Sequence, residues 1–311
     1  MPIPSCDGRT TDATIPYMLF DAQHLGADTE RLALSAVGAG FLGLDTATTE
    51  RNANSERGLG DYLRKLGKGL RGLLFVQSKF TPTARGHERG ALPWLEGDRP
   101  AERVRKSLRK ALENLAPLAA LGALLLHSPS EAARDTGALA PEDRETWLAL
   151  EDAVARGEAK SVGACNFNAA LLRELIDEAA AASAGGCRPA IVQNRCLAKT
   201  GWDREVRDLC RAHGIVYQAT GLLEANADAI GDPRGPVRAA AARLGVSAEQ
   251  VVLRFALQLG VVPVAAAASE ARMRDARDVY GAAFQLTLEE VAAIERWALP
   301  RAEDMRGAGE I

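Results

Sequence analysis

The sequence is poor in aromatic residues, has no strong excess of charge of either sign and contains no long apolar segment. Phenylalanine, tryptophan and tyrosine make up 5% of the 311 residues, and the formal net charge is −3. So small a net charge gives no electrostatic basis for binding nucleic acid. No apolar run reaches the roughly 18 residues of a membrane-spanning helix, and the amino terminus lacks the pattern of a signal peptide. We therefore expect a cytoplasmic protein with neither nucleic-acid nor membrane partners.

Cysteine is also scarce. The five cysteines are scattered, and no two lie at the short spacing of a zinc site or a redox dithiol: Cys6, Cys165, Cys187, Cys196 and Cys210. We expect reduced thiols and no metal site. Cys165 falls at the end of a predicted strand, and its simplest interpretation is a small buried thiol.

What the sequence does contain is an alternation of short β-type runs with longer segments of helical period. Apolar residues make up 47% of the chain, which is enough for a large core. The eight β-type runs are Tyr17 to Phe20, Phe41 to Asp45, Gly72 to Lys79, Ala120 to His127, Ser161 to Asn166, Ala190 to Gln193, Ile215 to Ala219 and Val261 to Ala265. Between them lie helical candidates, including Asp28 to Val37, Ala101 to Leu115, Glu142 to Arg156, Ala170 to Ala182 and Asp203 to His213, and two further helices precede the last run.

This alternation predicts a parallel sheet covered by helices. Several of the strands are nearly all apolar, such as Leu124 to Leu126, and such runs favour strands that are buried on both faces, as in a closed barrel. No linker divides the chain. We therefore predict that residues 1–311 form a single α/β domain, a (β/α)8 TIM barrel.

Polar residues gather where five of the predicted strands end: Asp45, Lys79, His127, Asn166 and Gln193. In a (β/α)8 barrel the carboxyl ends of the strands form the active face. A lysine at the end of an apolar strand is costly to bury unless it is paired, and Asp45 is the natural partner of Lys79. We therefore expect these two residues to form an ion pair at the active face.

The strand ends belong to sequence blocks that resemble the aldo/keto reductases. The resemblance extends from about Ile15 to Trp297, and its blocks follow the order of that family: Gly40 to Ala47, Leu74 to Lys79, Leu124 to Pro129, Gly163 to Phe167, Val192 to Asn194 and Ala248 to Arg254. It implies a (β/α)8 barrel that acts on a small molecule with NAD(P)H as the hydride source. In that family a tyrosine donates a proton to a carbonyl, and a lysine paired with an aspartate lowers the pKa of the tyrosine.

By position, Asp45 and Lys79 match the paired residues of the family. His127 matches the histidine that orients the carbonyl, and Asn166 and Gln193 match the residues that hold the nicotinamide amide. The resemblance therefore implies that most of the polar site is retained.

The catalytic tyrosine is missing from the matching position. The chain has only Tyr17, Tyr62, Tyr217 and Tyr280, and none of them lies in the segment after Asp45. Depending on the branch of the family used for alignment, the position is held by Glu50, by Ala53 or by Asn54. Tyr62 is predicted to lie within the following helix, too far along the chain to replace it.

Three further departures concern the cofactor. A carboxylate, Asp21, follows the first strand near the expected nicotinamide, and Thr220 stands where an aromatic residue stacks on that ring. The last strand runs into Ala265 to Ala268, where the family has a lysine and a hydroxyl residue for the phosphate, so that only Ser269 and Arg272 remain as phosphate contacts. We therefore expect weak binding of NADPH, or none.

Two enzyme hypotheses follow, with a non-catalytic binding protein as a third. The favoured hypothesis is cofactor-independent acid/base chemistry, an elimination, isomerisation or cyclisation, with catalytic Asp45, Lys79, His127 and Asp21 and substrate-binding His24, Glu50 and Asn52. The alternative is a carbonyl or imine reductase that uses NADPH or NADH and takes its proton through His127 or water. Its cofactor would bind at Asn166, Gln193, Ser269 and Arg272. The sequence sets no oligomeric state.

Overall fold

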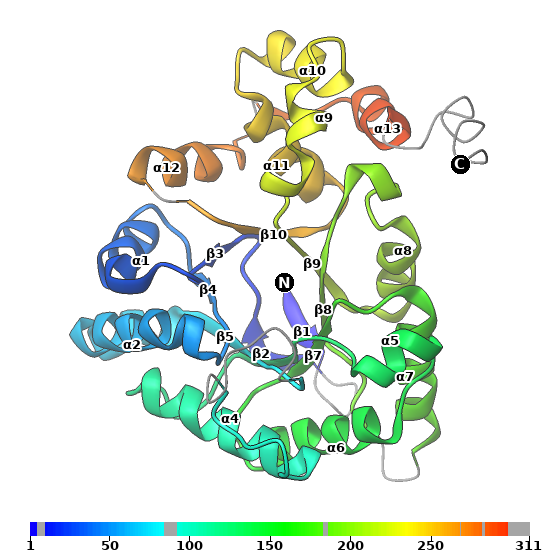
Figure 1. Cartoon of the computed structure of the whole chain (residues 1–311). Helices are drawn as coiled ribbons and strands as arrows, with labels where there is room; N and C mark the ends of the chain where they lie inside the picture. The colour runs from blue at the N-terminus through cyan, green and yellow to red at the C-terminus, as the bar shows by residue number, and fades with distance from the viewer. Residues whose placement is uncertain (5–9, 84–91, 183–185, 268, 282–283, 298–311) are drawn as a thin grey trace.

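A computed structural model describes residues 1–4, 10–83, 92–182, 186–267, 269–281 and 284–297, without the side chains of residues 3, 4, 10–13 and 50–54. Eight parallel strands form a closed barrel in the order β3-β4-β5-β6-β7-β8-β9-β10, with β10 beside β3 (Figure 1). The strands are β3 Leu19–Asp21, β4 Gly43–Asp45, β5 Phe75–Phe80, β6 Ala123–Leu126, β7 Val162–Cys165, β8 Ile191–Arg195, β9 Val216–Thr220 and β10 Val262–Ala265. The predicted (β/α)8 barrel is confirmed.

Helices surround this barrel in Figure 1. They are α1 Thr29–Gly38, α2 Glu50–Lys65, α3 Lys68–Leu73, α4 Pro100–Asn114, α5 Glu131–Thr136, α6 Pro141–Ala155, α7 Ala169–Ala181, α8 Arg204–His213, α9 Ala227–Gly231, α10 Pro236–Leu244, α11 Ala248–Gln258, α12 Glu270–Asp278 and α13 Leu288–Trp297. Short 3-10 turns lie at Gly26–Asp28, Ala198–Thr200 and Glu224–Asn226. No helix among the described residues is both long enough and apolar enough to cross a membrane.

Each predicted strand overlaps one strand of the barrel, with ends displaced by up to three residues. The largest errors, of three residues, are at the starts of β5 and β6, and at β5 the predicted run from Gly72 includes two residues that end the short helix α3. The side chain of Leu73 is exposed there, and the strand begins only at Phe75, whose amide donates to Leu42 O. A continuous apolar run does not show where a helix ends and a buried strand begins, so this boundary could not be read from the pattern.

The inside of the barrel has an apolar part and a polar part. Side chains from alternate strand positions, such as Leu19, Phe75, Leu125 and Val264, form an apolar cluster that is separate from the larger cluster between the strands and the helices. Alternate residues of a strand point to the same face, so the next inward position of β5 after Phe75 is Gln77. The interior therefore becomes polar toward the carboxyl ends of the strands.

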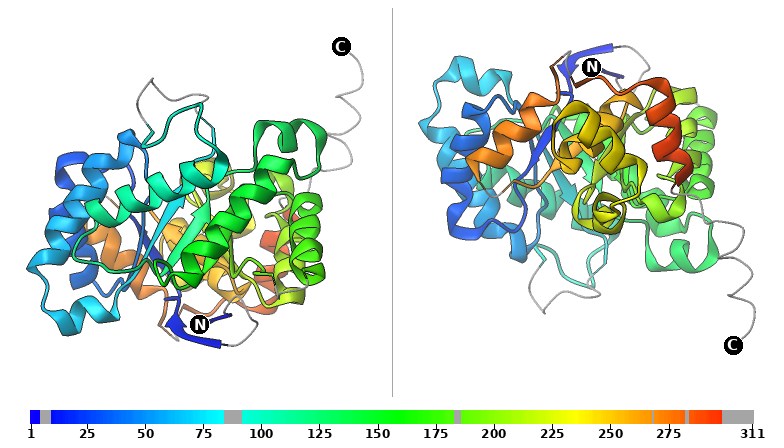
Figure 2. Two further views of the ribbon diagram at one scale, coloured as in Figure 1. Left: turned by 90° about the horizontal axis from the view of Figure 1, so that it is seen from below. Right: turned by 90° about the horizontal axis from the view of Figure 1, so that it is seen from above.

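A hairpin of β1 (Pro2–Pro4) and β2 (Thr10–Thr14) lies at one end of the barrel, and the amino group of Met1 donates to Ile15 O at 2.8 Å. Figure 2 shows this hairpin at the opposite end from α5, which follows the carboxyl end of β6. The hairpin thus lies at the amino ends of the strands, away from the polar part of the interior.

The expectation of reduced cysteines is wrong for Cys187, which is disulfide-bonded. Cys165, Cys196 and Cys210 are free and buried, and burial raises the pKa of each of these thiols to about 12. Cys6 lies outside the described residues. The prediction failed because it rested on spacing along the chain, and spacing does not report distance in the folded protein.

Candidate active site

The predicted pair of Lys79 and Asp45 is present and fully buried. Lys79 Nζ lies 2.6 Å from Asp45 Oδ2 and donates a second hydrogen bond of 3.0 Å to Thr46 O. Exposed fractions of 1% for the Lys79 side chain and 0% for that of Asp45 show that water does not screen this pair. A buried charge is tolerated when it is paired and hydrogen-bonded, and both conditions hold here.

Glutamine side chains hold the Asp45 carboxylate in place, and two of them, Gln77 and Gln218, were missed by the sequence analysis. Gln77 Nε2 and Gln193 Nε2 donate to Asp45 Oδ1 at 2.5 and 3.2 Å, and both also donate to Gln218 Oε1 at 2.8 and 3.0 Å. Gln218 Nε2 returns a bond of 3.0 Å to Gln77 Oε1. The four side chains form a closed hydrogen-bonded ring, the amide ring, which fixes the orientation of Asp45.

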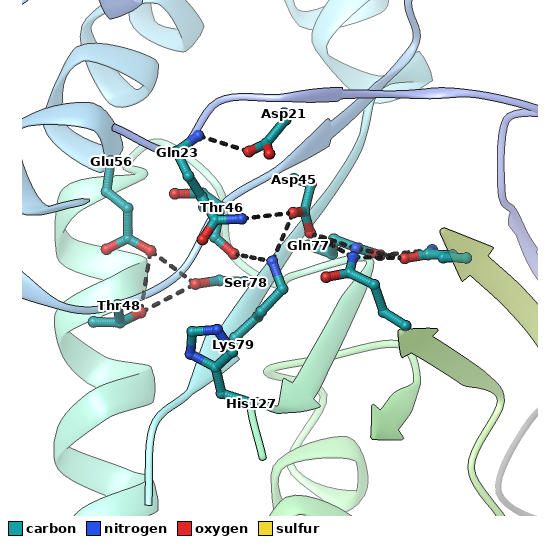
Figure 3. A network of polar contacts seen from close by, with 12 residues as sticks. Asp21, Gln23, Asp45, Thr46, Thr48, Glu56, Gln77, Ser78, Lys79 and His127 are labelled. Atoms are coloured by element: carbon teal, nitrogen blue, oxygen red, sulfur yellow. Dashed lines mark hydrogen bonds and ion pairs between the residues drawn. The ribbon is translucent and has the colours of Figure 1, made fainter. Parts of the chain in front are cut away.

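Asp21, the last residue of β3, is the other acidic group beside this pair. In the sheet it is the register partner of Asp45, and its Oδ1 accepts from the Gln23 amide at 3.0 Å (Figure 3). Burial, reinforced by the negative charge of Asp45, raises the pKa of Asp21 from 3.8 to about 6, while Lys79 opposes the rise. Asp21 is thus a carboxyl that exchanges protons near neutral pH.

A third carboxylate, Glu56 of α2, lies behind the strand that carries Lys79. Its Oε1 accepts from Ser78 Oγ at 2.7 Å and from Thr48 Oγ1 at 3.1 Å, and its Oε2 accepts from Asn114 Nδ2 at 3.0 Å. Burial raises the pKa of Glu56. Gly60 allows α2 to approach α4 this closely, because a Cβ there would lie 2.0 Å from Asn114 O. Glu56 therefore ties α2 to the back of β5.

His127 follows β6, two residues after Leu125, which pairs with Lys79 across the sheet. Its Nδ1 lies 2.9 Å from Thr81 Oγ1, and Trp94 Nε1 donates to Thr81 O at 3.1 Å. Lys79 and His127 both occupy inward-facing positions, and both lie toward the carboxyl end of the barrel. Figure 3 draws both side chains at the polar network.

The other predicted site residues are spread over several elements. Asn166 follows β7 with φ +61°, is exposed, and donates from Nδ2 to His127 O at 2.7 Å. His24 is exposed in the loop after β3, also with a positive φ of 60°. Ser269 caps α12, accepting from the Arg272 amide at 3.4 Å. The segment of Glu50 and Asn52, expected to be a loop, is the first turn of α2, and their side chains lie outside the description.

The four tyrosines have these positions. Tyr17 is exposed near the start of β3, and Tyr62 is buried within α2. Tyr217 on β9 donates to Asp203 Oδ2 at 2.8 Å, and the guanidinium of Arg277 lies over the ring of Tyr280 at 5.2 Å from its centroid. Among the described residues, Lys79 Nζ makes its hydrogen bonds to Asp45 and Thr46 and not to one of these tyrosines.

A groove of about 530 Å³ runs beside the carboxyl end of β10, between α11 and α12. Arg272 lines it, together with Ala265, Ala266, Ala267 and Arg238. The groove also contains the carboxylates of Glu224, Glu249 and Asp275. Its volume is in the range of small-molecule sites, and Arg272 places a cation at the first turn of α12, where helix amide groups favour anions.

The fold and the buried lysine–aspartate pair at the strand ends define a barrel enzyme. The aldo/keto reductase family model matches residues 26–298, and the chain belongs to the aldo/keto reductase family.

The chain is 28% identical over 289 residues to NADPH-dependent codeinone reductase 1-1 of Papaver somniferum, with 86% of this chain and 81% of that protein covered. It is 29% identical over 274 residues to deoxymugineic acid synthase 1-B of Triticum aestivum, covering 84% and 79% of the two chains. A crystal structure of an aldo/keto reductase from Brucella melitensis superposes with a TM-score of 0.73 at 22% identity, covering 95% of this chain and 97% of that one, and supports the fold.

These relatives overturn the expectation that no cofactor is used. The codeinone reductases are NADPH-dependent by name, and a chain that matches them over 86% of its length points to NADPH. The expectation gave too much weight to lost contacts at Thr220 and Ala265 to Ala268. It also took no account of the groove beside Arg272, which the strand pattern alone did not show.

Proposed function

We propose that the chain is a reductase of carbonyl or imine groups that uses NAD(P)H, and that its proton donor is not a tyrosine. The observation that carries the proposal is the buried Lys79–Asp45 pair at the carboxyl end of the barrel. A buried cation held in this way stabilises negative charge that develops on a substrate oxygen or on the conjugate base of a proton donor. The kinship with NADPH-dependent reductases supports the same chemistry.

The residues present fit a nicotinamide cofactor, which supplies the hydride when it is bound. Gln193 and Asn166 use their amide N–H groups within the protein, and neither Gln193 Oε1 nor Asn166 Oδ1 accepts a hydrogen bond from another described residue. Both oxygens can therefore accept from a carboxamide. Arg272, which lines the groove and is exposed, would hold phosphate together with Ser269 at the start of the same helix.

The chain offers two groups for proton delivery. Asp21 is protonated in part near neutral pH and lies beside the ion pair, whereas His127 carries an ionisable ring at the end of the neighbouring strand. A general acid works best when its pKa is close to the working pH. This condition favours Asp21 as the donor, with His127 orienting the substrate.

The proposed function is tested by absorbance of reduced nicotinamide during turnover of a panel of aldehydes, ketones and cyclic imines. Loss of NADPH absorbance in step with product formation is the expected result. Conversion of a substrate in cofactor-free buffer at the same rate would contradict the proposal, as would failure of both NADPH and NADH to bind in a fluorescence titration at millimolar concentration.

Replacement of Arg272 by alanine should weaken NADPH binding by about tenfold while changing NADH binding by less than about threefold. A charge-assisted contact to a phosphate is worth on the order of 1.5 kcal/mol, and NADH lacks the additional phosphate of NADPH. Protein fluorescence titration measures both constants. Arg274 is the matched control, because it is exposed on the same helix, does not line the groove and pairs with Glu270 at 3.7 Å. Equal weakening by Arg274→Ala would show that only the general charge of α12 matters.

A further inference from the structure

Arg195 is the last residue of β8, and it occupies one of the alternate positions of this strand that face the barrel interior. Ile191 belongs to the apolar cluster inside the barrel, and Gln193 donates to Asp45 and Gln218 within the amide ring. Asn194 points the other way, since its side chain bonds to Phe167 and to Asp203. Because alternate residues share a face, Arg195 projects to the same side as Gln193, one step closer to the open end.

The side chain of Arg195 is exposed, and it makes no hydrogen bond or ion pair with any described residue. An inward position can be exposed only where the barrel opens to solvent. Its register partner on β9 is Thr220, which is also partly exposed. Arg195 therefore lies at the open carboxyl end of the barrel, above the amide ring that holds Asp45.

Two carboxylates that bond to the residues just before Arg195 on β8 already have partners within the protein. Asp45 is bound by Lys79 and the glutamines, and Asp203 accepts from Tyr217 and Asn194. Arginines elsewhere in the chain do find acids, as when buried Arg207 pairs with Glu295 at 2.8 Å. A guanidinium without a partner at the entrance to a barrel is a binding group for an anion from outside the chain.

We propose that Arg195 binds a carboxylate of the substrate, so that the enzyme acts on oxo acids or imino acids. This inference rests on the proposed reductase function. The planar guanidinium matches a carboxylate with two parallel hydrogen bonds, and a ligand seated over the barrel removes the water that would otherwise screen the pair. The carboxylate would then set the position of the reacting group relative to Lys79 and Asp21.

Two matched pairs of ligands test the proposal: 4-carboxybenzaldehyde with its methyl ester, and 4-oxobutanoate with its methyl ester. Calorimetric titration in the presence of NADP⁺ measures binding without turnover. In the wild type at least one acid should bind about ten- to a hundredfold more tightly than its ester, as expected for a desolvated charge-assisted contact. Arg195→Met should abolish this preference and leave ester binding unchanged, and Arg195→Lys should retain part of it.

Arg173 is the matched control, because it is exposed on the outer helix α7 and has no partner among the described residues. Arg173→Met should keep the full preference for the acid. Equal binding of acid and ester in both pairs by the wild type, or a preference that survives in Arg195→Met, would overturn the proposal. So would a loss of NADPH affinity in Arg195→Met with the preference intact, since the guanidinium would then serve the cofactor.

The binding experiment separates this proposal from the proposed function. An acid preference that depends on Arg195, together with no oxidation of NADPH by any substrate, would sustain the carboxylate site and contradict the reductase. Oxidation of NADPH with equal kcat/KM for acid and ester would sustain the reductase and contradict the site.

Discussion

Replacement of Lys79 by methionine should lower kcat by about a hundred- to ten-thousandfold, the range expected when a group that assists proton transfer is removed. Methionine fills a similar volume but leaves the Asp45 carboxylate buried without its cation. Breaking a buried pair in this way costs about 3–5 kcal/mol of unfolding free energy. Steady-state kinetics and urea unfolding measure the two effects.

The double variant Lys79→Met/Asp45→Asn separates the two effects. The unpaired charge is absent from it, so its stability should recover most of the loss, whereas its activity should stay as low as that of the single variant. If activity recovered together with stability, the pair would serve the fold alone, and Lys79 would have no part in the reaction.

Replacement of Asp21 by asparagine should remove the pH dependence of kcat and lower its maximum by about a hundred- to ten-thousandfold. In the wild type the protonated carboxyl is the active form. With a pKa of about 6, its fraction falls tenfold for each pH unit above that value, so kcat should fall as pH rises. Kinetics from pH 5 to pH 8 with one substrate test this. A wild-type profile that stays level across this range, or the same falling limb in Asp21→Asn, would exclude Asp21 as the donor.

Stability gives a second measurement for Asp21 that does not depend on activity. Its pKa is higher in the folded chain than in the unfolded one, so the folded state binds more protons between the two values. The contribution to stability is complete below pH 3.8 and is lost as pH rises to about 6, by up to about 3 kcal/mol. The Asp21→Asn variant should lack this part of the pH dependence in chemical unfolding.

The barrel and the ion pair could be predicted because each depends on a local pattern. Apolar runs ended by polar residues mark buried strands, and a lysine at such an end requires an acid. The amide ring could not be predicted, because its bonds depend on the register of strands far apart in sequence, such as those of Gln77 and Gln218. The available signal was a single glutamine two positions before Lys79 and one glutamine in each of two other apolar strands.

The burial of Asp21 was missed for a related reason. Asp21 is a polar residue after an apolar run, so the sequence predicted that it lies in a loop. In the structure it is the last residue of β3 and the register partner of Asp45. Its raised pKa follows first from its burial and then from the charge of Asp45 on the neighbouring strand. The groove beside Arg272 likewise depends on how α11 and α12 pack, which no single segment specifies.

The amide ring also has a mechanical consequence. In the circular order of strands, β5 lies four positions from β9, and β4 lies four positions from β8, so the bonds from Gln77 to Gln218 and from Gln193 to Asp45 cross the full width of the barrel. These two connections cross the barrel side by side. They are joined at their ends by the bonds from Gln77 to Asp45 and from Gln193 to Gln218, each between neighbouring strands. Bonds across the barrel in this way resist flattening of its cross-section. Because Lys79 pairs with Asp45 of this ring, its position is set before any ligand arrives, and movements of the surrounding loops leave it in place.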